Sequence, residues 1–315
     1  MSDSVRPVRS ALILVATLHL AFVSFAANSV ATSGTLMNRL EAFLDEQFVE
    51  NPDLGLDDTI RLTDSEYRRL VPHHDSDALR RESDARLKEL LDAAWFVAAF
   101  SLEPRHIARV EAAFEELARR RIAAPGQSTK LLEILVGARL LEKAHAFASR
   151  YSPDRIGAIP TIIDHAASTA IQTLLDLSDP TGTLHRRQFT MQPVQLIVVA
   201  HPGCGFTRAA ARALAGDPRL ADLIEAHATW IVPPSLESDF EPIRSWNRDN
   251  PDRQMRLVYR RSEWPMIDLG GVPQFYFLKE GVVVHHVRGW RDNGQLAQIA
   301  EGFERLGIMP PPSLP

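Results

Sequence analysis

The chain has 315 residues, of which 45% are apolar and 24% are charged, a composition ordinary for a globular protein with one large or two average domains. Its formal net charge at pH 7 is −5. Because the charge is negative and lysine and arginine form no block, we expect no nucleic-acid partner.

The first 26 residues have the pattern of a bacterial export signal. Two arginines precede an apolar run at 11–23, and Ser24 and Ala26 supply the small side chains of a cleavage site. The run is shorter than the roughly 20 apolar residues that a membrane-spanning helix needs. We therefore expect a cleaved signal at 1–26 and a periplasmic or secreted protein. The alternative is contact with the membrane through an uncleaved signal.

Residues 27–180 are predicted to form an all-α domain. Apolar residues recur there at helical spacing. The expected helices cover 87–98, 107–117, 131–151 and 159–177. Residues 51–83 are polar and acidic, and we expect them to be a loosely ordered connection. Short helices joined by short loops favour a helical bundle over a helical-repeat array, because no second copy occurs at a fixed period.

The pattern changes after a turn-like segment at 179–182, and residues 181–309 are predicted to form an α/β domain. Short runs rich in β-branched residues indicate strands, and amphipathic stretches between them indicate helices. The expected strands cover 196–200, 229–232, 255–259, 274–278 and 282–287, and the expected helices cover 205–215, 240–247 and 293–306. Residues 310–315 are a proline-rich tail.

Cys204 is the only cysteine, and it lies where the first of these strands gives way to a helix. In an oxidising compartment a lone cysteine is a reactive thiol, an intermolecular bridge or an inert buried residue. The free amides of a helix N-terminus stabilise a thiolate, the nucleophile of thiol–disulfide exchange. Thr207, one helical turn later, can donate a hydrogen bond to that thiolate but cannot resolve a mixed disulfide.

The run from Gly271 to Gly281, GVPQFYFLKEG, closely resembles the cis-proline strand and following turn of thioredoxins. The strand, loop and helix around Cys204 and the chain from Val287 onward fit the same family, so the resemblance covers about residues 190–309. It implies a thioredoxin-like fold for this part of the chain.

The resemblance also implies which residues form the site. Cys204 would face Pro273, and the main chain of Val272 would pair with an extended substrate. The remaining substrate contacts would come from the loop residues Gly203, Gly205 and Phe206.

The sequence departs from the family at three positions. Gly203 replaces the tryptophan before the first cysteine, Thr207 replaces the second cysteine, and Val198 replaces a buried acidic residue. The loop Cys204–Thr207, CGFT, resembles the Cys-Gly-Phe-Ser loop of monothiol glutaredoxins, although its flanking sequence follows thioredoxin. The loop therefore retains a nucleophile without a resolving partner.

These observations predict an exported monothiol thiol–disulfide oxidoreductase. Cys204 and Thr207 would be its catalytic residues, and its partners would be protein thiols and disulfides or low-molecular-weight thiols. The alternative is a non-catalytic thioredoxin-fold module of an envelope complex, for example in conjugation or secretion, with the helical domain binding a protein partner. In that alternative Cys204 is vestigial.

Histidines suggest no metal site, and we expect neither metal nor cofactor. The pair His285–His286 lies on an expected strand, where adjacent side chains point to opposite faces. Neither that pair nor His73–His74 has a further ligand at metal-binding spacing. His201, three residues before Cys204, is interpreted as an exposed loop residue, with a role in stabilising the thiolate as the alternative.

Overall fold

A computed structural model of the chain describes residues 34–151, 159–167, 169, 171–177, 182–237, 239–291 and 295–309. The predicted export signal and the proline-rich tail lie outside these residues. The described chain begins with helices and continues into a mixed sheet with further helices, so the predicted fold class is confirmed. Among the described helices, none has the length and apolar character needed to cross a membrane.

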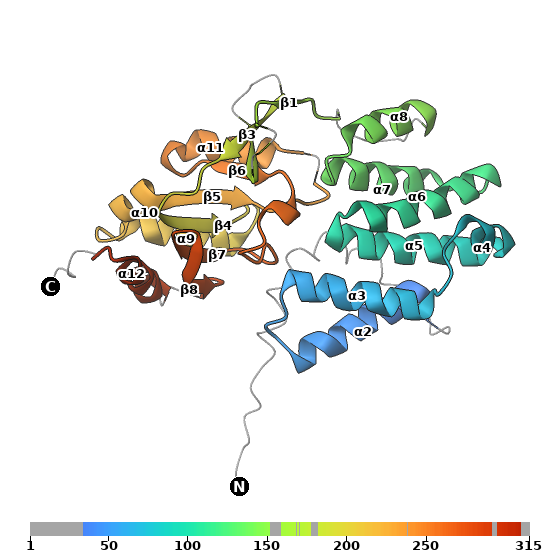
Figure 1. The fold of residues 1–315 in the computed structure, drawn as a ribbon, viewed down its shortest axis with the longest axis horizontal. Coiled ribbons are helices and arrows are strands. Elements are labelled where there is room, and N and C mark those ends of the chain that lie inside the picture. The colour runs from blue at the N-terminus through green and yellow to red at the C-terminus, as the bar shows by residue number, and fades with distance from the viewer. Residues whose placement is uncertain are drawn as a thin grey trace, which may run out of the picture.

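The helical part covers residues 34–151. Its helices are α2 (Leu36–Glu50), α3 (Leu56–Leu70), α4 (Ser76–Arg81), α5 (Asp84–Ser101), α6 (Pro104–Arg119), α7 (Pro125–Gly137) and α8 (Leu141–Tyr151). Figure 1 shows them stacked largely in chain order. Helix α5 is the centre of their core, because it contacts α2, α3, α6 and α7.

Two local predictions for the helical part are wrong. Residues 51–83 are not loosely ordered, since they contain α3 and α4. Helix α3 buries polar side chains that an apolar pattern does not reveal; the buried carboxylate of Asp64, for example, accepts a 2.6 Å hydrogen bond from Arg109 Nη1. The single helix predicted over 131–151 is divided into α7 and α8, because the chain turns at Arg139, where φ is +60°.

Eight strands of the described chain form one sheet in the order β1-β3-β2-β6-β5-β4-β7-β8. They are β1 (Ile162–Asp164), β2 (Gln172–Asp176), β3 (Leu184–Phe189), β4 (Val194–Val199), β5 (Ala228–Val232), β6 (Met255–Val258), β7 (Gln274–Lys279) and β8 (Val282–Arg288). Strands β4, β5 and β6 are parallel to one another, whereas β7 is antiparallel to both β4 and β8.

The helix predicted over 159–177 is wrong, because β1 and β2 occupy this segment. Strand β2 pairs antiparallel with both β3 and β6, so it is an interior strand of the sheet. Leu174 and Leu175 of β2 are buried on opposite faces, in two different cores. The sheet therefore includes residues on both sides of the predicted division at residue 180.

The strands and helices predicted after residue 190 are present within two residues at each end. The helices of this part are α9 (Gly205–Gly216), α10 (Ala221–His227), α11 (Glu241–Asp249) and α12 (Gln295–Leu306), with short 3₁₀ turns η2 (Pro251–Arg253) and η3 (Arg261–Glu263). Helix α10 was not predicted from the sequence.

The two faces of the sheet are covered differently. On one face, α9, α10, α11 and α12 pack on the sheet; we call this the helix-side core, and its central members include Val198, Leu214, Phe277 and Phe303. On the other face, the segment that connects β6 to β7 packs on the sheet without a helix longer than η3. We call this the loop-side core, and its members include Ile197, Val199, Cys204, Trp264, Leu269 and Val272.

The β6–β7 connection also contacts the helical part. Leu56 N, at the start of α3, donates a 3.2 Å hydrogen bond to Asp268 Oδ1. Arg261 forms ion pairs with Asp57 (2.7 Å) and Glu103 (2.9 Å). The helical part is therefore attached to the segment that precedes β7.

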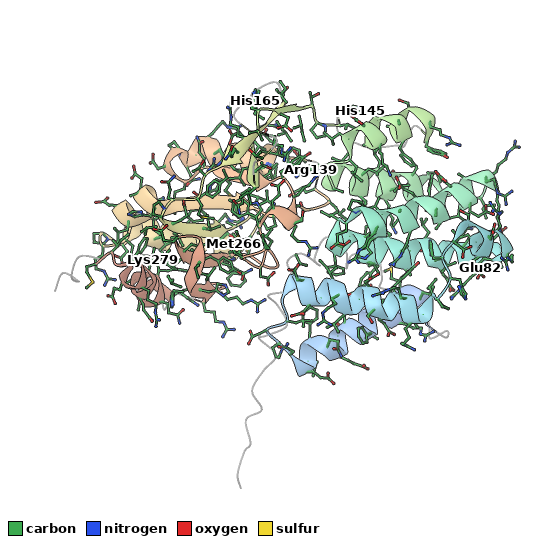
Figure 2. All side chains as sticks on the ribbon, in the orientation of Figure 1. Glu82, Arg139, His145, His165, Met266 and Lys279 are labelled. Atoms are coloured by element: carbon green, nitrogen blue, oxygen red, sulfur yellow. The ribbon has the colours of Figure 1, made fainter. Side chains whose placement is uncertain are left out.

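A second contact joins the β5–α11 loop to the end of α7. Leu236 packs against the core of the helical part, and Gly137 lies so close to the Ser235 carbonyl that a Cβ atom there would be 2.7 Å from its oxygen. Arg139, labelled between the two parts in Figure 2, is buried with its guanidinium carbon 5.8 Å from the centre of the Phe240 ring. Two loops of the α/β part thus contact the helical part.

Candidate functional site

Cys204 occupies the N-cap position of α9, directly after the turn that follows β4. Its amide donates to His201 O (3.0 Å), and its carbonyl accepts from Arg208 N (3.1 Å). Only 5% of the residue surface is exposed. The first amides of a helix lack intrahelical partners and carry partial positive charge, so a negative charge on this sulfur would be favoured.

The register of the sheet places Pro273 beside this cysteine. Val199 at the end of β4 pairs with Gln274 at the start of β7, so the residues just before β7 lie next to those just after β4. The Val272–Pro273 peptide bond is cis. Cys204 Sγ donates to Val272 O at 3.5 Å, which is the hydrogen bond of a protonated thiol.

Thr207 is fully buried one turn into α9. Its Oγ1 accepts a long hydrogen bond, 3.5 Å, from the amide of His201. In this conformation the hydroxyl contributes to the turn before Cys204, and the donation to a Cys204 thiolate stays a prediction.

The predicted substrate-contacting residues surround the sulfur unequally. Gly203 and Gly205 are exposed on either side of Cys204, and Phe206 is half-buried. Val272 is buried, with 8% of its surface exposed. The exposed backbone on either side of Cys204 is therefore that of the two glycines, and Arg208, whose Nη1 donates to Pro202 O at 2.7 Å, lies against the same loop.

His201 holds the turn that leads to Cys204. Its Nδ1 accepts a hydrogen bond from Gly203 N at 3.1 Å, so Nε2 carries the hydrogen and donates to Glu237 Oε2 at 2.8 Å. The ring is half-buried instead of fully exposed as interpreted from the sequence. Glu237 lies 36 residues away in the β5–α11 loop, and no motif in the sequence links the two residues.

Gln274 holds the loop on the other side of the sulfur. Its buried side-chain amide donates to the carbonyls of Asp268, Gly270 and Gly271, the residues that lead to Val272. Its Oε1 is 2.8 Å from the hydroxyl of Tyr276, which donates to it. This arrangement was not predicted, because a glutamine after a proline has no characteristic spacing to its partners.

His286 completes this polar cluster. Its Nε2 donates to Gln274 Oε1 at 3.0 Å, and its ring stacks on Tyr276 with centroids 4.2 Å apart. Burial lowers the pKa of His286 to about 4. The histidine is therefore neutral near pH 7. It holds Gln274 through the hydrogen bond that its Nε2 donates, without carrying a charge.

The chain offers little to a metal ion at this site. In the residues described by the structure, no group of three or more His, Cys, Asp or Glu side chains is arranged to hold a metal. Around Cys204 the neighbouring side chains of the loop-side core are apolar. The chemistry available at this site is that of one thiol.

The strand order defines the fold. Strands β5, β4, β7 and β8 lie side by side in that order, with α9 after β4 and α12 after β8, both packed in the helix-side core. This is the arrangement of the thioredoxin-like fold, with the single cysteine at the N-terminus of α9, the helix that follows β4. The chain is therefore a helical part followed by a thioredoxin-like part.

Two solved structures are similar to this chain. A candidate protein disulfide isomerase from Bacteroides thetaiotaomicron is 15% identical and covers 46% of this chain and 92% of its own length, with a TM-score of 0.32. A thioredoxin-like protein from Bacteroides caccae ATCC 43185 is 12% identical and covers 88% of this chain and 97% of its own length, with a TM-score of 0.30. These values are too low to support any statement about activity.

No protein-family model matches the chain. No curated protein matches it either.

Proposed function

We propose that this chain is an exported monothiol thiol–disulfide oxidoreductase whose nucleophile is Cys204. The observation that carries the proposal is the position of Cys204: it is the N-cap residue of α9, and its sulfur lies 3.5 Å from the carbonyl of Val272, beside Pro273. The helix N-terminus favours the thiolate, and Val272 supplies a main-chain carbonyl beside it.

The proposed reaction has two steps of thiol–disulfide exchange. The Cys204 thiolate attacks one sulfur of a substrate disulfide, a new bond forms to Cys204 Sγ, and the other substrate sulfur leaves as a thiolate. An external low-molecular-weight thiolate then attacks this mixed disulfide and releases Cys204. Overall one substrate sulfur leaves as a thiolate, one equivalent of external thiol forms a disulfide with the other substrate sulfur, and Cys204 is regenerated.

The hydrogen bond from Cys204 to Val272 O couples the thiol to substrate binding. While the thiol is protonated, it occupies this carbonyl. A thiolate has no proton to donate, so ionisation leaves the Val272 carbonyl available to an amide of an extended substrate. The nucleophile and its backbone-binding partner would therefore become available together.

The test uses the absence of a resolving cysteine. The purified chain, oxidised with a small disulfide such as glutathione disulfide, should hold a stable mixed disulfide visible by intact mass, and Cys204→Ser should hold none. Thr207→Cys should release the adduct as an intramolecular disulfide, because residues three apart at a helix start are within bridging distance. An unmodified wild-type chain, or an adduct that persists in Thr207→Cys, contradicts the proposal.

One observation favours the non-catalytic alternative, in which the thioredoxin-like part is a binding module of an envelope complex. Cys204 is 5% exposed and packs in the loop-side core, with Thr207 where a resolving cysteine would be. In that case the native chain would react with iodoacetamide only on unfolding. The oxidoreductase is supported instead if iodoacetamide alkylates the folded chain and the rate increases with pH at values below about 8.5, the usual pKa of a free thiol.

Export is a separate part of the proposal and is supported by the signal pattern of residues 1–26. Expression of the full chain in a Gram-negative host, followed by fractionation and intact mass measurement, tests it. We expect a periplasmic product that begins near Ala27. A full-length cytoplasmic product would contradict export without affecting the proposed chemistry of Cys204.

A further inference from the structure

An open hollow lies at the end of the sheet opposite Cys204. Its volume is about 300 Å³, and its lining includes Gln188, Phe189, Thr190, Gln195, Thr229 and Arg256. We call it the Arg256 hollow. Gln195 and Thr229 lie near the starts of β4 and β5, whereas Cys204 follows the end of β4, so the two sites are separated by the length of the parallel strands.

The hollow exists because the loop-side face is only partly covered. The apolar residues Ile197 and Val199 of β4 lie under the β6–β7 connection, in the loop-side core. Gln195 belongs to the same face, since side chains alternate along a strand. At this end of the strands the face is polar, and the pocket forms there.

Arg256 is the charged group of the hollow. Its side chain is half-buried on β6, and its guanidinium carbon is 5.7 Å from the centre of the Phe189 ring. Within the described chain, the guanidinium of Arg256 makes no hydrogen bond and no ion pair, although its backbone pairs with β5. None of its nitrogens is among the fully buried unpaired atoms, so its five donors face the open hollow and are available to an anionic ligand.

The carboxylate that acts on Arg256 does not neutralise the hollow. Asp176 of β2 acts electrostatically on Arg256, but its Oδ2 is 2.9 Å from Arg187 Nε. Two arginines therefore share one carboxylate, which leaves a net charge of about +1 at this end of the sheet. Burial lowers the pKa of Arg256, yet a guanidinium remains charged near neutrality.

The second donor is Thr229. Gln195 Nε2 donates to Thr229 Oγ1 and to His227 O, each at 3.0 Å, so the glutamine amide is fixed. Because Thr229 Oγ1 accepts from an amide, its own hydroxyl hydrogen is free to be donated. Arg256 and Thr229 thus offer donors to one ligand.

We infer that the Arg256 hollow binds a small molecule through an oxyanion, either a carboxylate or a phosphate group. The planar guanidinium pairs with two oxygens of such a group at once, and Thr229 supplies a further hydrogen bond. The volume is at the lower end of the range of ligand pockets, so it suits a small molecule. The inference is independent of the chemistry of Cys204.

The experiment measures binding of inorganic phosphate and of succinate to the full chain by calorimetry at constant ionic strength. We expect saturable binding of at least one anion, and the tighter one identifies the chemical class. Arg256→Met should weaken it at least tenfold, about 1.4 kcal/mol. Arg260→Met, at an exposed arginine four residues later, should leave it unchanged.

Arg256→Lys is the second variant, in case Arg256→Met does not fold. It keeps the charge but loses the two-pronged geometry, so binding should weaken several-fold. The inference is overturned if neither anion binds the wild-type chain below about 10 mM, or if both Arg256 variants bind as tightly as the wild type.

Discussion

Replacement of Gln274 by leucine should loosen the loop that carries Val272. Gln274 is 1% exposed, and its amide donates to three carbonyls in the loop before Val272. Leucine has a similar size but no polar atoms, so Gln274→Leu removes these hydrogen bonds without creating a large cavity.

The expected cost follows from the groups left without partners. Asp268 O can then accept the Tyr276 hydroxyl hydrogen that Gln274 Oε1 no longer takes. Gly270 O and Gly271 O lose the donor that Gln274 provided, and His286 Nε2 loses its acceptor. Each buried group without a partner costs about 1–3 kcal/mol. After the apolar gain of leucine, of order 1 kcal/mol, we expect Gln274→Leu to lower the free energy of unfolding by about 2–4 kcal/mol.

Urea denaturation near pH 7 measures this free energy. Gln298→Leu makes the same change at an exposed position of α12 and should alter it by less than about 0.5 kcal/mol. The iodoacetamide reaction of Cys204 in the folded Gln274→Leu chain should accelerate, because the Val272 carbonyl is no longer held against the sulfur. A loss no greater than that of the control, with an unchanged alkylation rate, would refute the bracing role of Gln274.

Two further predictions concern packing and pH. Gly302→Ala should lower the free energy of unfolding, measured in urea, by about 1–3 kcal/mol, because its Cβ would be 2.4 Å from the buried Phe277 ring. The control is Gly216→Ala, which should be neutral or stabilising because a Cβ there meets nothing within 4 Å. Burial lowers the pKa of His106, despite the opposing effect of Asp64. The unfolded chain therefore binds a proton at this histidine more readily than the folded chain, so the free energy of unfolding decreases as the pH drops below 6.5. His106→Gln should reduce the loss of stability between about pH 7.5 and 5.5, and exposed His145→Gln should not. An equal destabilisation by both alanine variants, or an unchanged pH dependence in His106→Gln, would contradict these expectations.

The strands after residue 190 could be predicted because their signals are local. Runs such as that of β4 are rich in β-branched residues and end at turn residues. Helix α3 could not be predicted, because its buried face is partly polar: Asp64 pairs with Arg109 of α6, whereas Thr63 bonds to a carbonyl within α3 itself. Strands β1 and β2 could not be predicted either, since their assignment depends on pairing with β3 and β6.

The candidate site was predictable only where residue types are diagnostic. Cys204 and Pro273 stand out as a cysteine before a helix and a proline before a strand, and the structure brings them together. Glu237 and the carbonyls bound by Gln274 are ordinary residues and groups, and their roles depend on loop conformation. Arg256 was not predicted either, because the sequence does not show that its guanidinium lies in a hollow without a protein partner.

The place of β2 in the sheet has a practical consequence for dissecting the molecule. A fragment that starts at residue 181 would leave the edge of β6 bare where Leu174 and Leu175 now pair with it. Open apolar edges invite other chains to add to them, so such a fragment should aggregate. A fragment that starts near Ile159 would retain every strand of the sheet and is the sensible unit for separate expression.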